Sequence, residues 1–171
     1  MKILIAYSSK SGTTRECAEV LAKKLSPQTP TLADLENETP DITNYDLVII
    51  GGYVRMGKLS KTTVKYIKDN AAILEETMHA FFLCCGLPES TDYYFEKAIS
   101  RSLLNNSIAN MSFGGELRIK QQKGFDKLWA KMILASIKNN NISENMNEEQ
   151  AIPAIVPENI SRFADEIRHC F

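Results

Sequence analysis

Blocks of apolar residues alternate along the chain with segments in which apolar residues recur at helical spacing. Three continuous apolar runs, at 1–7, 45–51 and 80–85, are typical of strands buried on both faces of a parallel sheet. A weaker strand is predicted at 31–35, and a fourth strong strand is predicted at 111–117. Helices are predicted at 13–25, 63–74, 93–104, 125–137 and 157–169. This order predicts an α/β fold, in which a doubly wound, five-stranded parallel sheet lies between two layers of helices.

The bulk composition narrows the class of protein further. A length of 171 residues and a hydrophobic share of 44% indicate a single globular domain, 1–171. A net charge of −1 gives no reason to expect a nucleic-acid partner. The four cysteines lack metal-ligand spacing, so we expect free thiols and no metal site. The sequence shows neither a signal peptide nor an apolar run of roughly 18 residues, so a cytoplasmic location is expected.

The charges are unevenly distributed along the chain. Segment 118–138 holds six basic residues and one acidic residue, whereas the rest holds 14 basic and 20 acidic residues. We interpret 118–150 as an insert near the last strand, made of a basic amphipathic helix, 124–138, and a polar loop. A helix of this kind that carries a tryptophan, here Trp129, can lie on an anionic membrane or a partner protein. It can equally pack on its own domain, and the sequence leaves both interpretations open.

The segment Ser9–Thr14 joins the first strand to the first helix and is the strongest functional signal. Strand-to-helix loops meet at one edge of a parallel sheet, where ligands bind. The amides of this loop and the helix dipole favour an anion, and four hydroxyl side chains add donors. Gly12 permits a tight turn, and Thr13 with Glu16 fits a capping box. The loop lacks the glycine and lysine patterns of P-loop and dinucleotide-binding proteins. It therefore predicts a site for the phosphate of a retained cofactor.

The pattern Ser9-x-Ser11-Gly12-x-Thr14 resembles the phosphate loop of the flavodoxin family. The resemblance implies a flavodoxin-like fold, FMN as a non-covalent cofactor, and electron transfer between redox partner proteins. Because FMN supplies the chemistry, no catalytic residue is predicted. The cofactor-binding residues that the resemblance implies are Ser9, Lys10, Ser11, Gly12, Thr13, Thr14, Tyr53, Val54, Arg55, Met56, Gly57, Cys85, Gly86 and Leu87.

Two further loops complete the site that the family resemblance implies. In the loop after the strand at 45–51, either Tyr53 or Met56 could stack on the flavin ring, or both could simply pack within the loop. Gly57 resembles the position whose carbonyl can turn toward flavin N5. The loop from Cys85 to Leu87 would contact the pyrimidine edge through its backbone. An aromatic residue, Tyr93 or Tyr94, could cover the other ring face or belong to the next helix.

The segment 53–57 and the aromatic, basic segment after the fourth strong strand also resemble the flavodoxin-type, quinone-dependent protoporphyrinogen oxidases. That resemblance implies an alternative function: a dehydrogenase that passes electrons from protoporphyrinogen IX to a quinone. It would act at the inner membrane face through peripheral contact of helix 124–138. Another alternative is a signalling module without a cofactor. Receiver domains of that kind need an acidic cluster after the first strand, where this chain has Ser8 and Ser9.

Overall fold

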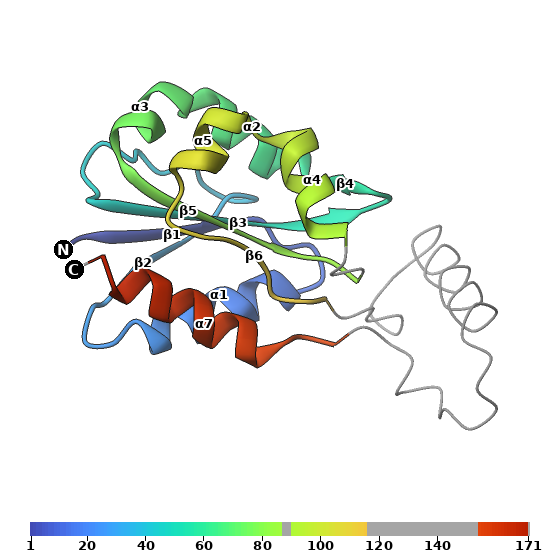
Figure 1. The fold of residues 1–171 in the computed structure, drawn as a ribbon, viewed down its shortest axis with the longest axis horizontal. Coiled ribbons are helices and arrows are strands. Elements are labelled where there is room, and N and C mark those ends of the chain that lie inside the picture. Colours follow the sequence, from blue (N-terminus) through green and yellow to red (C-terminus); the bar gives the residue numbers. More distant parts are fainter. Residues whose placement is uncertain (87–89, 116–153, 171) are drawn as a thin grey trace.

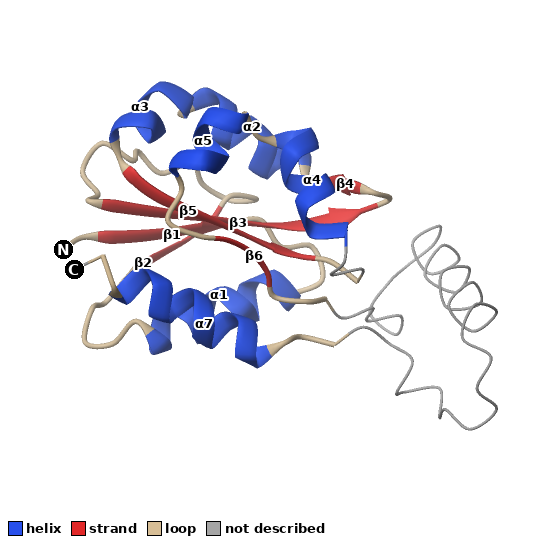
Figure 2. Ribbon diagram, in the orientation of Figure 1, coloured by secondary structure: helices blue, strands red, loops and turns tan. Residues whose placement is uncertain are grey.

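The sheet is built from five parallel strands in the order β2-β1-β3-β5-β6 (Figures 1 and 2). The computed structural model describes residues 1–86, 90–115 and 154–170. The parallel strands are β1 (Ile3–Tyr7), β2 (Thr31–Asp34), β3 (Leu47–Arg55), β5 (Met78–Cys84) and β6 (Asn110–Ser112). A sixth, short strand, β4 (Lys58–Leu59), pairs antiparallel with the end of β3. The predicted five-stranded parallel sheet is therefore confirmed, with a two-residue addition.

Helices cover both faces of this sheet, as Figure 1 shows. One face carries α1 (Thr13–Lys24) and α7 (Pro157–Arg168). The other carries α2 (Lys61–Asp69), α3 (Ala71–Glu76), α4 (Thr91–Ala98) and α5 (Arg101–Asn106). Each face of the sheet has its own hydrophobic cluster beneath its helices. The predicted three-layer α/β/α architecture is confirmed.

Two helices predicted as continuous are each divided in two. The predicted helix 63–74 breaks at Asn70, whose side-chain amide donates to the carbonyl of Tyr66 at 2.9 Å. The Tyr66 carbonyl also accepts the Asn70 amide at 3.2 Å, so the side chain and the backbone of Asn70 share one acceptor at the break. The predicted helix 93–104 breaks at Ile99, which is buried with extended backbone, and Ser100 then caps α5. Local packing thus overrides a helical pattern at both positions.

The second strong strand runs further than its sequence predicted. The sequence predicts that the strand ends at Gly51 and that a loop follows at 52–60, yet β3 continues to Arg55 and turns back into β4. A glycine is needed at both positions because an added Cβ would lie 2.0 Å from the Phe82 ring at Gly51 and 2.7 Å from the Thr63 hydroxyl at Gly52. The glycines therefore make room for neighbouring side chains within a strand. The predicted loop 52–60 is corrected to a β-hairpin.

Several predictions fall outside the part of the chain that the structure describes. They are the insert 118–150, its helix 124–138, Leu87 and the end of the predicted strand 111–117. No helix in the described ranges is long and apolar enough to span a membrane.

Candidate functional site

The loop between β1 and α1 exposes the start of a helix at the edge where the parallel strands end (Figure 1). Gly12 is the N-cap of α1 and has φ 89°, a left-handed conformation that costs a residue with a Cβ about 1–2 kcal/mol. The capping box predicted at Thr13 and Glu16 is wrong, because Thr13 is already helical and no side chain caps the helix. The amides of Thr13 and Thr14 have no partner within the helix by its geometry. They are thus available to an anion.

Hydroxyl groups surround this helix start. The Oγ atoms of Ser11 and Thr13 lie 3.5 Å apart, and Ser9 Oγ accepts the Arg15 amide at 3.3 Å. Ser9 and Ser11 are half-buried and therefore within reach of solvent and ligand. Thr14 is almost fully buried and its hydroxyl hydrogen-bonds to the Cys84 thiol. The structure thus brings together the donors predicted in this loop, while Thr14 faces the core.

A buried hydroxyl triad joins this loop to β3 and α2. Ser8 Oγ lies 2.6 Å from Ser60 Oγ and 2.7 Å from Thr63 Oγ1, and Ser60 donates to Thr63 at 2.8 Å. Thr63 in turn donates to the carbonyl of Gly51 at 3.2 Å, and the Ser8 amide donates to the same oxygen at 3.1 Å. All three side chains are buried and satisfied. The triad fixes the position of the helix start relative to the hairpin.

Sequence reasoning missed this triad as a functional feature. The sequence marks Ser8 only as the residue that stands where receiver domains have an acidic one. Its hydrogen-bond partners lie more than 50 positions away along the chain. One signal was available in the sequence, since Ser60 directly precedes a helix and its Oγ accepts the Thr63 amide as an N-cap. The contact with Ser8 depends on the fold.

The β3–β4 hairpin has a two-residue tip, Met56 and Gly57, with φ of 50° and 71°. Positive φ at both positions matches the twist of the flanking strands. Met56 is 62% exposed, and an added Cβ at Gly57 would meet no atom within 4 Å. Tyr53 is half-buried, and its pKa is raised mainly by burial and also by the charge of Glu36. Met56 therefore stands at the tip of the hairpin. Tyr53 lies at the base of the hairpin, and the hydroxyl of Tyr53 is neutral.

The loop after β5 is described only through Gly86. The Cys85 amide donates to the Gly114 carbonyl at 2.9 Å and is therefore not available to a ligand, and Gly86 is half-buried. Tyr93 and Tyr94 both belong to α4, as one of the two sequence interpretations held. Tyr93 is 56% exposed and Tyr94 is buried.

The adjacent cysteines that end β5 face opposite sides of the sheet. Cys84 lies in the cluster beneath α1 and α7, whereas Cys85 lies in the cluster beneath α2 to α5. A hydrogen bond with Cys17 raises the pKa of the Cys84 thiol, and burial raises it further. Neutral, buried thiols are poor nucleophiles, so these cysteines pack rather than react.

The geometry fits a phosphorylated cofactor whose tail lies at the start of α1. The amides and hydroxyls of the loop would bind a phosphate by neutral donors, and the hairpin beside it offers a flexible apolar side chain, Met56, and an aromatic one, Tyr53. The loop contains Lys10 but lacks the glycine–lysine–hydroxyl pattern of a phosphoryl-transfer loop.

This fold and this loop define the class of protein. The family model described as "Flavodoxin domain" matches residues 4–144, and the chain belongs to that family. Solved structures agree in fold: the flavodoxin of Streptococcus pneumonia TIGR4 has a TM-score of 0.58 at 13% identity, with all of both chains covered. A Fusobacterium nucleatum flavodoxin variant bound to flavin mononucleotide has a TM-score of 0.52 at 13% identity, covering 99% of this chain and 96% of that one. The predicted class, an FMN-binding, flavodoxin-like electron-transfer protein, is confirmed.

Within that class, the chain is similar to one enzyme in particular. It is 30% identical over 145 residues to the protoporphyrinogen IX dehydrogenase [quinone] of Escherichia coli (strain K12). The match covers 78% of this chain and 79% of that protein. The resemblance to this branch, inferred from the sequence, is therefore confirmed.

Proposed function

We propose that the chain holds FMN with its phosphate at the start of α1 and its ring beside the β3–β4 hairpin, and that it carries electrons between redox partners. The observation that carries the proposal is the start of α1, where the left-handed Gly12 is the N-cap and no side chain caps the first amides of the helix. A dianionic phosphate there is favoured by those amides and by the helix dipole.

Different residues would bind the phosphate tail and the ring of FMN. Ser9, Ser11 and Thr13 would donate hydroxyl hydrogen bonds to the phosphate, and Gly12 lets the backbone approach it. Lys10 is exposed and would add positive charge at the mouth of the loop. FMN itself accepts and releases the electrons, so the protein contributes position and exclusion of water.

The hairpin and the loop after β5 would position the flavin ring. Tyr53 or Met56 would cover one ring face, and Val54 and Arg55 form the half-buried strand end that supports them. The carbonyl of Gly57 would lie near N5, because Gly57 stands at the exposed tip of the hairpin and corresponds to the position that the family resemblance implies. On the opposite side, Cys85 and Gly86 would border the pyrimidine edge, as would Leu87, which lies outside the described residues.

Absorbance titration of apoprotein with FMN tests this assignment. Wild-type protein is expected to bind one FMN, and Ser11→Ala is expected to weaken binding about tenfold, because hydrogen bonds to a charged group contribute about 1.5–3 kcal/mol. The matched control is Ser161→Ala, whose Oγ donates to the Pro157 carbonyl on exposed α7. A protein that takes up no FMN, or an equal loss in both variants, would contradict the assignment.

A second candidate function is the oxidation of protoporphyrinogen IX with a quinone as acceptor. Its support is the 30% identity with the E. coli dehydrogenase over most of both chains. The predicted basic helix 124–138 would then attach the protein to the inner face of the membrane from the cytoplasm. A porphyrinogen oxidation assay with a quinone, together with flotation on anionic liposomes, separates this function from that of a carrier. Trp129→Ala should reduce flotation, and absence of both oxidation and flotation would leave the carrier function alone.

A further inference from the structure

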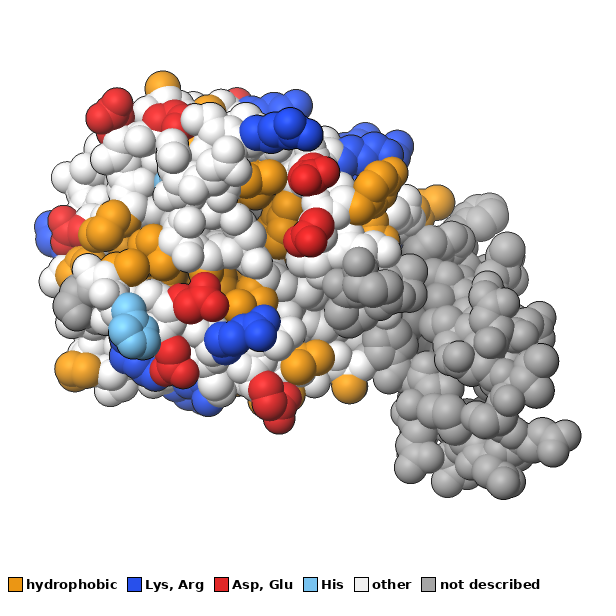
Figure 3. Space-filling view, in the orientation of Figure 1, with side chains coloured by type: hydrophobic (Ala, Val, Ile, Leu, Met, Phe, Trp, Pro, Cys, Tyr) orange, Lys and Arg blue, Asp and Glu red, His pale blue; other side chains and the backbone are white. Residues whose placement is uncertain are grey.

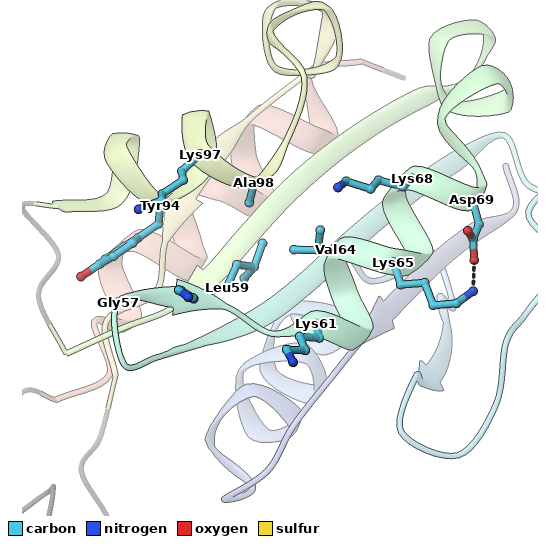
Figure 4. Close-up of a pocket in the computed structure, with 11 residues that line it drawn as sticks. Gly57, Leu59, Lys61, Val64, Lys65, Lys68, Asp69, Tyr94, Lys97 and Ala98 are labelled. Atoms are coloured by element: carbon cyan, nitrogen blue, oxygen red, sulfur yellow. Dashed lines mark hydrogen bonds and ion pairs between the residues drawn. The ribbon is translucent and has the colours of Figure 1, made fainter.

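A second hollow lies on the α2–α4 side of the sheet, apart from the helix start that receives the phosphate. It has a volume of about 430 Å³ and runs between α2, α4 and the β3–β4 hairpin (Figure 4). Its lining consists of Gly57, Lys58, Leu59, Lys61, Val64, Lys65, Lys68, Asp69, Tyr94, Lys97 and Ala98. Because one end is formed by Gly57, anything that binds in this groove also reaches the hairpin proposed to hold the flavin ring.

The floor of the groove is apolar. Leu59 and Tyr94 are 7% and 8% exposed, and Val64 and Ala98 are half-buried beside them. Tyr93 on α4, which is 56% exposed and accepts a hydrogen bond from Lys97 of the lining, extends this surface. An apolar centre of this kind is typical of the middle of a protein interface.

The rim of the groove is strongly basic, with five lysines and a single aspartate. Figure 4 shows Lys68 extending across the groove, while Lys65 turns away to its ion pair with Asp69. Lys97 donates to the Tyr93 hydroxyl at 2.7 Å and lies 5.0 Å from that ring's centre.

Four of these lysines form no ion pair with any residue that the structure describes, and Lys97 among them contacts Tyr93 instead. Among the residues that the structure describes, no ion pair involves Lys58, Lys61 or Lys68. Blue and orange side chains accordingly lie next to each other over the α2–α4 layer in Figure 3. Lys61 and Lys68 are seven residues apart on α2, about 10 Å along the helix axis, so they spread the charge over a surface rather than converging on one ion.

We propose that this groove is the docking surface for an acidic electron-transfer protein. An apolar centre with a charged rim matches the anatomy of a small, transient interface, and the separated lysines match carboxylates distributed over a protein surface. Docking in the groove would bring the partner's redox centre close to the hairpin that is proposed to hold the flavin ring. The inference therefore rests on the proposed electron-transfer function. Each reduced partner gives up one electron, so two partners and two protons from water reduce one FMN.

The test uses FMN-loaded full-length protein and a reduced plant-type [2Fe–2S] ferredoxin as the acidic probe. Stopped-flow reduction of the flavin should slow as ionic strength rises, and Lys61→Glu/Lys68→Glu should slow it about tenfold at low salt, because rim charges steer association. The matched control, Lys23→Glu/Lys24→Glu, makes the same charge change on α1, in the other helix layer, and should leave the rate unchanged. Dithionite should reduce all three proteins equally.

A structural readout accompanies the kinetics. The paramagnetic trianion hexacyanochromate(III) should broaden the amide resonances of residues 58–68 in ¹⁵N-labelled protein, and the double variant should lose this broadening. The proposal is overturned if the ferredoxin rate does not depend on salt, if both double variants slow it equally, or if the broadening lies elsewhere. It is also overturned if the lysines control binding to anionic vesicles but leave the ferredoxin rate unchanged. A protein that holds no FMN at all would instead refute the proposed function.

Discussion

Replacing Ser8 by alanine removes the group that ties the phosphate loop to β3 and α2. Its hydroxyl lies 2.6 Å from Ser60 Oγ and 2.7 Å from Thr63 Oγ1 in a fully buried position. In the variant Ser60 still donates to Thr63, and Thr63 still donates to the Gly51 carbonyl, so no hydroxyl proton is left without an acceptor. The expected loss is therefore that of the hydrogen bonds alone, about 1–2 kcal/mol of unfolding free energy.

Thr63→Val is expected to be more costly, about 2–3 kcal/mol, because Thr63 accepts from Ser60, donates to the Gly51 carbonyl and lies 2.7 Å from Ser8 Oγ. Ser8 and Thr63 are in contact, so the double variant should lose less than the sum of the two single losses, by about 0.5–1.5 kcal/mol. For a domain of this size, the Ser8→Ala loss corresponds to a fall in Tm of roughly 2–8 °C.

Urea unfolding at constant pH, followed by circular dichroism, measures all four corners of this cycle. FMN affinity should weaken in Ser8→Ala as well, because the helix start loses its attachment to the hairpin. Ser107→Ala removes a half-buried hydroxyl that donates to a carbonyl at 2.7 Å and serves as the control for loss of a hydroxyl away from the site. Strictly additive losses, or unchanged FMN affinity in Ser8→Ala, would refute the reasoning that the triad acts as a unit and fixes the loop.

Two further outcomes are expected from the core and the thiols. Gly51→Ala should lower the unfolding free energy by at least about 3 kcal/mol, because its Cβ would lie 2.0 Å from the Phe82 ring. Phe82→Leu should recover part of this loss. Equal stability of Gly51→Ala and wild type in urea would contradict this prediction. Iodoacetamide at pH 8 should modify the exposed Cys170 first. The raised pKa of Cys84 keeps that thiol neutral in the fold, so its contribution to stability is present below the unfolded pKa, near 9, and falls as the pH rises above it. Rapid alkylation of Cys84 in native protein, read by mass spectrometry, would show that this thiol is accessible.

The layered sheet was predictable because its signal is carried by continuous apolar runs. The strands β1 and β5 and the first six residues of β3 are almost entirely buried, and these segments contain almost no polar residues. The phosphate loop was predictable for a related reason: its hydroxyls and Gly12 are contiguous and stand at a fixed place between strand and helix. Local sequence is sufficient where the signal lies within one contiguous segment.

The rest depends on contacts between distant segments. The two glycines of β3 resemble turn residues until the Phe82 ring and the Thr63 hydroxyl are known to fill the space beside them. Met56 at the hairpin tip has a positive φ, which is uncommon for a residue with a Cβ and cannot be predicted from a methionine in the sequence. The basic groove is likewise formed by α2, α4 and β4 together, so its lysines look like ordinary solvated charges in the sequence.

Comparing the protein bound to FMN with the protein bound to riboflavin tests the central claim most directly, because the two ligands differ only in the phosphate. In ¹H–¹⁵N correlation spectra of the two complexes, the largest differences should fall on the amides of residues 9–14, with smaller changes at the hairpin tip. FMN should also bind at least tenfold more tightly than riboflavin, because its phosphate accepts hydrogen bonds for which riboflavin has no acceptor. Equal affinities, or differences confined to other parts of the chain, would contradict the account.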